Sequence, residues 1–402
     1  MTVSRKTPKK STMDVLDTLR ASVDRVLALA EKKGVPPRHV TQRDYAAAHP
    51  SLPSFADFTA ARAEAEKEYK AANPVPVDVI PEGHRLRGVS TLVDPKGNIQ
   101  AQWVKTTNAE TQGEIVARLI RELPSTIKPR KASITNGHAS EPDTMAVYPL
   151  GDPHVGLLAW AKESGADFDL KIAEDLMVGA MRDLVLRGPR AAEALIVNLG
   201  DFFHADNGDN HTTHGTHTLD VDGRTPRVLQ VGVRIMVSLI DAALEHHKRV
   251  TVDNRIGNHD AYTALWLSIA LGAYYRNEPR VTIPVSETHR SYYEFGTNLI
   301  GCTHGDRAKA NDLGAIMAAE KPEAWGRTRH RLWLTGHVHH SAAKEYRGVR
   351  VESFRTLAAR DSWHAAQGYV AGRDMHRITL HRTRGETGRE IVNVDSLLRS
   401  GT

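Results

Sequence analysis

The sequence predicts an α/β fold over residues 143–402. Five apolar runs in this region each end in Asp, Asn or His residues, and segments with helical periodicity separate them. An apolar run that ends in a polar ligand is typical of a buried parallel strand, which presents side chains at its carboxyl end. Alternating strands and helices are typical of a layered α/β core.

The strands of this core are expected in order along the chain. They are predicted at 145–150, 195–199, 250–256, 299–303 and 332–335, with helices at 169–187, 226–247, 261–275 and 309–320. Further strands are predicted at 348–354, 374–382 and 390–395.

Composition limits the class of protein. The 402 residues are 40% hydrophobic and 25% charged, as in soluble globular proteins with room for more than one domain. No apolar run approaches the roughly 18 residues of a membrane span, and no apolar segment follows the basic residues 1–11, so we expect no membrane partner and no secretory signal. The single cysteine, Cys302, excludes an intrachain disulfide and fits a reducing, cytoplasmic compartment.

The charge is uneven along the chain. Residues 1–140 hold 22 Lys/Arg and 15 Asp/Glu, a net of +7, whereas the remainder holds 31 and 33, a net of −2. A basic first part indicates a polyanionic partner such as nucleic acid. The alternative is a solvated basic surface with a disordered tail.

The first 142 residues are predicted to form two small regions. After a basic arm, helices at 13–34, 41–48 and 54–72 form either a helix-turn-helix or a small bundle. Beyond a Pro-rich linker at 73–82, a β-hairpin turns at Lys96-Gly97 and is followed by a helix at 110–123 and a second linker at 124–142. Trp103, with Arg87 and Lys105, could grip a nucleic acid, but we favour a core position for it. The expected domains are 1–72, 73–142 and 143–402.

The polar residues at the strand ends have the chemistry of metal ligands. They are Asp152, His154, Asp201, Asn258, His304, His337 and His339. They include no Cys, which disfavours a structural zinc finger, and mixed nitrogen and oxygen donors suit Mn, Fe or Zn better than Mg. Seven donors exceed one tetrahedral site and suit two divalent ions that share a carboxylate. Two ions about 3.5–4 Å apart can clamp a phosphoryl group, and a nearby histidine can protonate the leaving oxygen.

The order of these motifs resembles the calcineurin-like metallophosphoesterase superfamily over residues 145–340. The motifs are Asp152-x-His154, Gly200-Asp201-x-x-His204, Gly257-Asn258-His259-Asp260, His304 and Gly336-His337-x-His339. The resemblance implies a four-layer α/β/β/α sandwich, here with a smaller N-terminal α+β region. It implies one metal held by Asp152, His154, Asp201 and His339, and another held by Asp201, Asn258, His304 and His337. His259 would act on the leaving group, and His204 occupies a further family position, so both are catalytic candidates.

Two motifs bear on the branch of the superfamily. The protein Ser/Thr phosphatases carry Asp-Arg-Gly after the second motif and Gly-Asn-His-Glu as the third, whereas this chain has Phe202-Phe203-His204 and Asp260. It is more similar to DNA double-strand-break repair exonucleases. Its whole layout resembles phosphoesterases of bacteriophages and prophages, which implies the cytoplasm of a bacterial host.

Two loops are candidates for substrate binding. The polar insert 205–226, which includes His211, His214 and His217, could cover the metals and bind phosphate through Arg224 or Arg227, or it could be a solvated loop. The segment 355–369 contains Arg360, Trp363 and His364. It could hold a nucleotide by stacking and by Arg–phosphate contact, or Trp363 could pack the loop down.

The predicted function is a phosphoesterase with two divalent metals, Mn being favoured over Fe or Zn. We expect a nuclease or phosphodiesterase for DNA or nucleotides that works by in-line attack of metal-bound hydroxide, with His259 assisting departure. The alternatives are a small-molecule phosphatase or cyclic-nucleotide phosphodiesterase, and a DNA-binding or assembly protein with a structural metal site. No heptad run or internal repeat indicates an oligomeric state.

Overall fold

The computed structural model describes residues 12–49, 55–72, 84–93, 99–108, short pieces between 114 and 122, and residues 141–208, 210–212 and 218–399. The chain divides into two compact units, Met1–Thr111 and Gln112–Thr402. The predicted basic arm, the linker at 73–82, most of the helix at 110–123 and nearly all of the second linker lie outside the described residues. The predicted three-part division therefore stays a prediction.

The first unit contains a small helical bundle. Helices α1 (Thr12–Lys33), α2 (Gln42–Ala48) and α3 (Phe55–Ala72), with the short 3-10 helix η1 (Pro37–His39), surround one core. Its members are Val23, Val26, Ala30, Val40, Tyr45, Phe58, Ala61 and Ala65. Thr41 starts α2 with a capping box, because its hydroxyl accepts the Asp44 amide and the Asp44 carboxylate accepts the Thr41 amide.

The first unit also contains the predicted hairpin. Strand β1 (His84–Val93) pairs antiparallel with β2 (Ile99–Asn108), while the predicted turn lies outside the described residues. Trp103 is 57% exposed on this ribbon, and Arg87 and Lys105 are exposed as well. Our expectation that Trp103 is a core residue is therefore wrong. A two-stranded ribbon has no interior of its own in which to bury an indole.

The second unit is built on two sheets. The six-stranded sheet has the order β13-β12-β3-β4-β5-β6, in which β3 (Glu141–Leu150), β4 (Ala191–Asn198), β5 (Arg249–Asn254) and β6 (Val281–Thr282) are parallel. Strands β12 (Asp374–His381) and β13 (Gly385–Asn393) extend it antiparallel. The five-stranded sheet has the order β10-β11-β9-β8-β7, with bounds β7 (Arg290–Phe295), β8 (Asn298–Thr303), β9 (His330–Thr335), β10 (Ala342–Tyr346) and β11 (Val349–Ser353).

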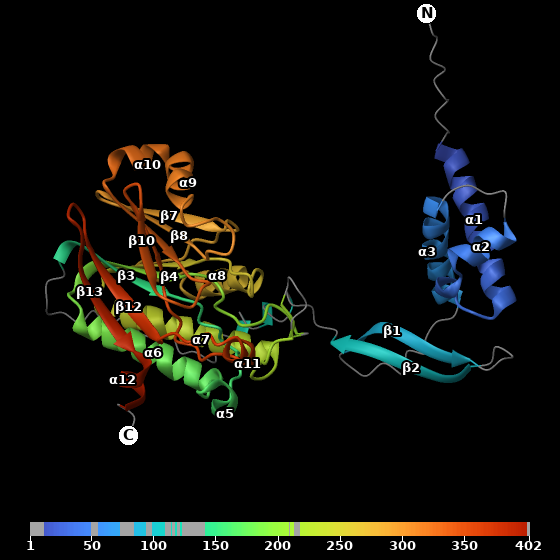
Figure 1. Ribbon diagram of the computed structural model, residues 1–402, viewed down its shortest axis with the longest axis horizontal. Coiled ribbons are helices and arrows are strands. Elements are labelled where there is room, and N and C mark those ends of the chain that lie inside the picture. The colour runs from blue at the N-terminus through green and yellow to red at the C-terminus, as the bar shows by residue number, and fades with distance from the viewer. Residues whose placement is uncertain are drawn as a thin grey trace, which may run out of the picture. The chain divides into compact units, whose positions relative to one another are not determined.

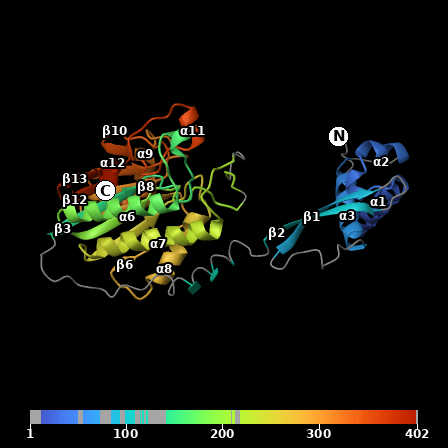
Figure 2. The ribbon, with the colours of Figure 1, turned by 90° about the horizontal axis from the view of Figure 1, so that it is seen from below.

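The alternation of side chains along the strands sorts the second unit into layers. On β3, Met145 and Val147 point into a core between the sheets, together with residues of β4, β8 and β9. Ala146 and Tyr148 point the other way, into a core with α6 (Leu170–Arg187), α7 (Thr225–Leu244) and α8 (Thr263–Tyr274). On the far side, Trp333 packs with α9 (Leu313–Glu320) and α10 (Pro322–Arg327). The predicted α/β class and its four α/β/β/α layers are confirmed (Figures 1 and 2).

Several elements differ from the prediction. The edge strands β7 and β10 were not predicted, because their sequences mix charged and aromatic residues without an apolar run. The short helix α11 (Ser362–Ala366) lies in the segment 355–369, which was expected to be a loop, and the short helix α5 (Ala161–Ser164) lies where no element was predicted. The last predicted strand ends early, since α12 (Val394–Arg399) begins at Val394. No described helix is both long and apolar enough to cross a membrane.

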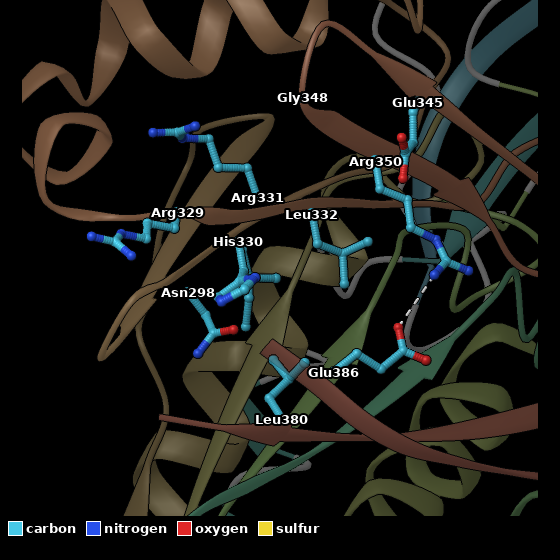
Figure 3. Close-up of a pocket in the computed structure, with 11 residues that line it drawn as sticks. Asn298, Arg329, His330, Arg331, Leu332, Glu345, Gly348, Arg350, Leu380 and Glu386 are labelled. Atoms are coloured by element: carbon cyan, nitrogen blue, oxygen red, sulfur yellow. Dashed lines mark hydrogen bonds and ion pairs between the residues drawn. The ribbon is translucent and has the colours of Figure 1, made fainter. Parts of the chain in front are cut away.

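A pocket of about 250 Å³ lies at the amino ends of β8 and β9, where Asn298 and His330 are the first strand residues (Figure 3). Its charged lining is mixed, and Arg350 contacts Glu386 at 3.4 Å. The predicted ligands follow the carboxyl ends of these parallel strands. This pocket is therefore not the predicted metal site.

A buried ion pair gives a test of the fold. Arg255 and Asp253 are each about 1% exposed and form an ion pair, and Arg255 also donates to the Thr288 carbonyl at 2.9 Å. Replacing Arg255 with Met leaves the Asp253 carboxylate buried without its cation. We expect urea unfolding to show a loss of about 3–5 kcal/mol.

The matched control is Arg249→Met, which removes the partly exposed pair with Glu193. This variant should lose less than about 1 kcal/mol. Equal losses of unfolding free energy in the two variants would show that the buried pair contributes no more to stability than the exposed one.

Candidate metal centre

The structure brings all seven predicted ligands together at the carboxyl ends of strands from both sheets. Asp152 and His154 follow β3, Asp201 follows β4, and Asn258 follows β5. From the other sheet, His304 follows β8, and His337 and His339 follow β9. Because parallel strands end at a common edge, motifs far apart in the sequence converge on one place.

The ligands form two neighbouring clusters. In the first, donor atoms of Asp152, His154 and His339 all lie within 4.8 Å of one another, and the Nε2 atoms of the two histidines are 3.1 Å apart. In the second, donor atoms of Asp201, His304 and His337 lie within 4.8 Å of one another.

His304 joins the two clusters. Its Nε2 is 3.2 Å from Asp201 Oδ2 and 2.9 Å from Asn258 Oδ1. Its Nδ1 donates to the Leu199 carbonyl at 3.0 Å and lies 3.6 Å from Asp152 Oδ1. The two clusters of donor atoms are therefore in contact through His304, as two adjacent cations require.

The backbone at the ligands is strained. Asp152, His154, Asp201, His337 and His339 have positive φ angles of 42°, 45°, 51°, 69° and 53°. Only two other non-glycine residues among those described, Asn210 and Arg347, have a positive φ. L-residues rarely adopt this conformation, and such strain concentrates at functional sites. The fold thus holds the ligands in costly conformations that turn their side chains toward one centre.

Glycines give the ligands their space. A Cβ on Gly257 would lie 2.0 Å from Asp201 Oδ1, and one on Gly336 would lie 2.7 Å from Asp152 Oδ2. Gly200 combines a φ of 97° with a Cβ position 2.7 Å from His304 Nδ1. A side chain at these positions would occupy the place of a ligand. This explains why Gly stands beside Asp, Asn and His in three of the motifs.

Backbone amides orient the carboxylates. The His337 amide donates to Asp152 at 2.9 Å, and the His259 amide donates to Asp201 Oδ1 at 2.7 Å. Asp260 accepts the amides of Asp201, Phe202 and Gly257 at 3.1, 2.7 and 3.0 Å, which ties the second motif to the third. The sequence singled out Asp260 only as a departure from the phosphatase motif. Its role depends on contacts between segments that are distant in the sequence.

Electrostatics at the centre favour bound cations. Burial raises the pKa of Asp152 to about 7, and burial opposes the charge of Asp201 as well, but the neighbouring His304 outweighs it and lowers the pKa of Asp201 to about 2. The Asp201 carboxylate in turn raises the pKa of His304 to about 10 against the effect of burial. Two carboxylates that are buried near each other, such as Asp152 and Asp201, need a positively charged partner.

The other histidines are held in the neutral form. Burial and neighbouring imidazoles lower the pKa of His154 well below its ordinary value and that of His339 to about 4. Burial also lowers the pKa of His337. Neutral imidazole is the form that binds metals. Together with the space left by the glycines, this donor set fits two divalent cations.

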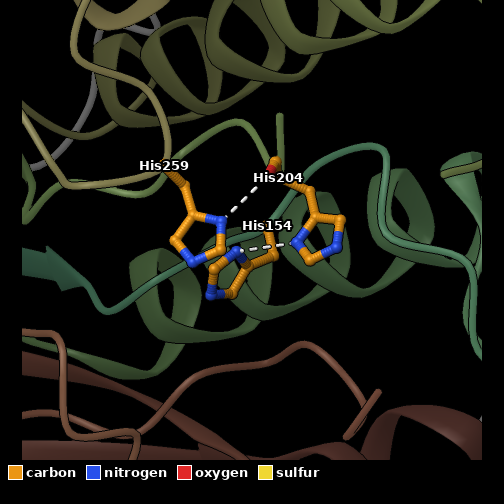
Figure 4. A group of neighbouring side chains, drawn as sticks. All are labelled: His154, His204 and His259. Carbon is orange, nitrogen blue, oxygen red and sulfur yellow. Dashed lines mark hydrogen bonds between the residues drawn. The ribbon is translucent and has the colours of Figure 1, made fainter. Parts of the chain in front are cut away.

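His204 and His259 lie next to His154 of the first cluster (Figure 4). His204 is 2% exposed, and its Nδ1 lies 3.2 Å from His154 Nδ1, so it acts on the site through that ligand. His259 is half-buried and donates from Nδ1 to the His204 carbonyl at 2.9 Å. This bond leaves His259 Nε2 as the nitrogen available to a substrate.

The predicted substrate-binding residues have different positions. His364 stacks on the ligand His339 with ring centroids 5.1 Å apart, and Trp363 beside it is 54% exposed. The guanidinium of Arg360 donates to the carbonyls of Tyr369 and Ser164 at 3.0 and 2.8 Å, so it braces the loop. Arg224 is exposed at the start of α7.

Part of the insert 205–226 holds other elements in place. Asp206 accepts the Thr263 amide at 2.8 Å at the start of α8, and Val221 bridges to Leu157. His214 and His217 lie outside the described residues.

No protein-family model and no curated protein matches the sequence. Solved structures resemble part of the chain. A predicted phosphoesterase from Streptococcus pneumoniae is 13% identical, with 64% of this chain and 99% of that chain covered and a TM-score of 0.27. Vps29 with Zn²⁺ from Entamoeba histolytica is 13% identical (62% and 99%, TM-score 0.27), and an archaeal phosphodiesterase is 12% identical (62% and 100%, TM-score 0.33). These TM-scores are too low to support an assignment, which therefore depends on the geometry of this chain.

Gly257→Ala tests the centre without removing a ligand. The new methyl group would displace the Asp201 carboxylate, so we expect Mn affinity to fall on the order of 10–100-fold, as when groups that orient ligands are lost. Equilibrium dialysis with elemental analysis measures this. Gly272→Ala in α8, where a Cβ meets nothing within 4 Å, is the matched control and should bind Mn normally. Equal affinity in both variants would contradict the close approach at Gly257.

Proposed function

We propose that this chain is a metal-dependent phosphoric ester hydrolase of the calcineurin-like metallophosphoesterase type. The observation that supports it most is the meeting of two donor clusters at Asp152, Asp201 and His304. Two adjacent divalent sites can bind one phosphoryl group at two oxygens. The mixed nitrogen and oxygen donors suit Mn, Fe or Zn, and Mn remains our proposal.

The seven ligand residues are assigned to two cations. Asp152, His154 and His339 would hold one cation, Asn258, His304 and His337 would hold the other, and Asp201 would serve both. Bound cations would supply Lewis-acid stabilisation of the phosphoryl oxygens and a more acidic water. His337 is exposed and His259 and His339 are partly exposed, so the centre is open to solvent at these histidines.

We assign to His259 the delivery of a proton from Nε2 to the leaving oxygen, which requires a ring protonated at both nitrogens, since Nδ1 donates to the His204 carbonyl. Its Nδ1 is fixed by the His204 carbonyl, and its half-buried ring lies 5.1 Å from the ring of the ligand His154. A side chain with one nitrogen anchored and the other free is oriented for proton transfer. His204, which stacks on His259 at 5.5 Å, positions it.

The proposed substrates are phosphodiesters of DNA or nucleotides. The net charge of +7 on residues 1–140 and the exposed Arg87, Trp103 and Lys105 of the hairpin support a nucleic-acid partner. A small-molecule phosphatase or cyclic-nucleotide phosphodiesterase would use the same centre. A DNA-binding or assembly protein with a structural metal site would bind DNA without cleaving it.

Three variants test the catalytic assignment in Mn-dependent hydrolysis of single-stranded DNA, double-stranded DNA and bis-p-nitrophenyl phosphate. Asp201→Ala should abolish turnover together with metal binding. His259→Ala should keep its metal and lose about 10²–10⁴-fold in kcat. His340→Ala, which removes the exposed histidine next to His339, is the control and should keep wild-type activity.

The pattern over the substrates separates the candidate functions. DNA cleavage that Asp201→Ala removes supports a nuclease, whereas turnover of the small ester alone supports a small-molecule enzyme. DNA binding without any hydrolysis would support the binding protein. Unchanged turnover in both Asp201→Ala and His259→Ala would refute the assignment.

The role of the hairpin has its own test. If Lys105 contacts a phosphate, Lys105→Ala should weaken DNA binding equally for all sequences and reduce the slope of log K against log salt by about 1. Fluorescence anisotropy at several salt concentrations measures the slope. Lys171→Ala on α6, which removes an exposed lysine paired with Asp175, is the control. The same slope in Lys105→Ala and wild type would remove the hairpin from the DNA-binding surface.

A further inference from the structure

Several exposed apolar side chains lie in segments that follow the ligand motifs or in and just after α11. Among the described residues of the second unit, this set comprises Leu158, Trp160, Tyr262, Val338, Trp363, Tyr369 and Val370. Leu158 and Trp160 follow the first motif, Tyr262 follows the third, and Val338 lies between two ligands. Large exposed apolar groups near a polar centre indicate a surface that contacts a ligand.

Two of these residues form a pair of stacked rings. The centroids of Trp363 and Tyr369 are 5.9 Å apart at an interplanar angle of 26°, and the side chains are 54% and 58% exposed. Both rings therefore have surface open to solvent. A pair of exposed parallel rings can accept a further flat aromatic group by stacking.

The ring pair lies close to the metal centre. Trp363 and His364 pack edge to face with ring centroids 5.0 Å apart, and the centroid of Tyr369 lies 5.7 Å from that of His364. His364 in turn stacks on the ligand His339 at 5.1 Å and 25°. Only one imidazole thus separates the ring pair from a ligand of the first cluster, which is the scale of a single nucleotide from phosphate to base.

The loop that carries the rings is held by other contacts. Asp361 accepts both the amide and the Nδ1 proton of His364 at 2.7 Å. Arg360 donates to the Tyr369 carbonyl at 3.0 Å, and the Tyr369 amide donates to the His364 carbonyl at 3.1 Å. The polar contacts fix the backbone on both sides of the rings. Stacking of Trp363 is therefore not needed to hold the loop, and its open surface is preorganised for a ligand.

We propose that Trp363 and Tyr369 form a stacking platform for an unpaired nucleobase of the substrate, whose phosphate lies at the metal centre. This inference rests on the proposed phosphoesterase function and narrows its substrate to nucleotides, single strands or strand ends. Bases inside a duplex are already stacked and offer no free face. Stacking on an aromatic ring tolerates any base, so the platform selects for an unpaired base and not for a sequence.

The test compares two esters with the same leaving group. Thymidine 5′-(4-nitrophenyl) phosphate carries a base, and methyl 4-nitrophenyl phosphate does not. In the Mn-loaded full chain, we expect Trp363→Ala to reduce the preference for the thymidine ester, measured as the ratio of the two kcat/KM values, about tenfold, mainly through KM. Tyr369→Ala should act in the same direction, and Trp363→Phe, which keeps a ring, should retain most of the preference.

Leu186→Ala is the matched control, because it removes an exposed apolar side chain at the end of α6. It should leave the preference as in wild type. An unchanged preference in Trp363→Ala with both esters still turned over would overturn the platform and leave the phosphoesterase function standing. A selective loss in Tyr262→Ala, with none in Trp363→Ala, would also overturn it.

The two proposals fail in different ways. If wild-type protein hydrolyses neither ester, the phosphoesterase proposal fails, and binding of thymidine 5′-monophosphate to the Mn-loaded chain then tests the platform. Weaker binding by Trp363→Ala than by wild type, with equal binding of inorganic phosphate, would support the platform. Equal binding of the nucleotide by both proteins would overturn it.

Discussion

The carboxylate of Asp201 is the group on which the arrangement of the centre depends. It accepts the His259 amide, contacts His304 from the other sheet, and lies against a position that only glycine can occupy. Its own amide is held by Asp260, so a contact between the second and third motifs fixes the loop that carries it. One buried carboxylate thus links both sheets, and it is connected to the first donor cluster through His304. Such a charge is stable there only with a positive partner, which is the protonated His304 in the chain alone and would be a bound cation once His304 has lost that proton.

The metal centre has unfavourable backbone conformations, and the packing of the rest of the second unit compensates for their free-energy cost. Five ligands have positive φ, and three motif glycines leave space that ligand side chains occupy. The two sheets pack against each other through a shared apolar core, and helices cover both outer faces. This rigid frame can hold strained loops at the strand ends because the strands beneath them are buried on both sides. Backbone strain at the candidate metal centre is consistent with side chains that are held in place in advance for divalent cations.

Most of the core could be predicted from the sequence, because buried parallel strands are apolar runs and the ligands follow them directly. The edge strands β7 and β10 could not, since one side of each strand is unpaired and its sequence is polar. Trp103 was misplaced because the pattern of a hairpin does not tell whether a second layer covers it. The role of Asp260 and the brace formed by Arg360 were equally hidden, since both depend on backbone groups of segments distant in sequence.

The centre combines two kinds of surface with different origins. The candidate metal-binding side is buried, rich in glycine and built from strand ends. Few of its residues can therefore be substituted without displacing a donor atom. The side formed by α11 and its loop is exposed and aromatic, and it is attached through polar contacts of Asp361 and Arg360. Residues of the first kind determine which chemistry is possible, since they fix the donors. In the proposed function, residues of the second kind would contact the part of the substrate beyond the phosphate. Substrate preference can therefore change through this loop while the chemistry at Asp201 stays the same.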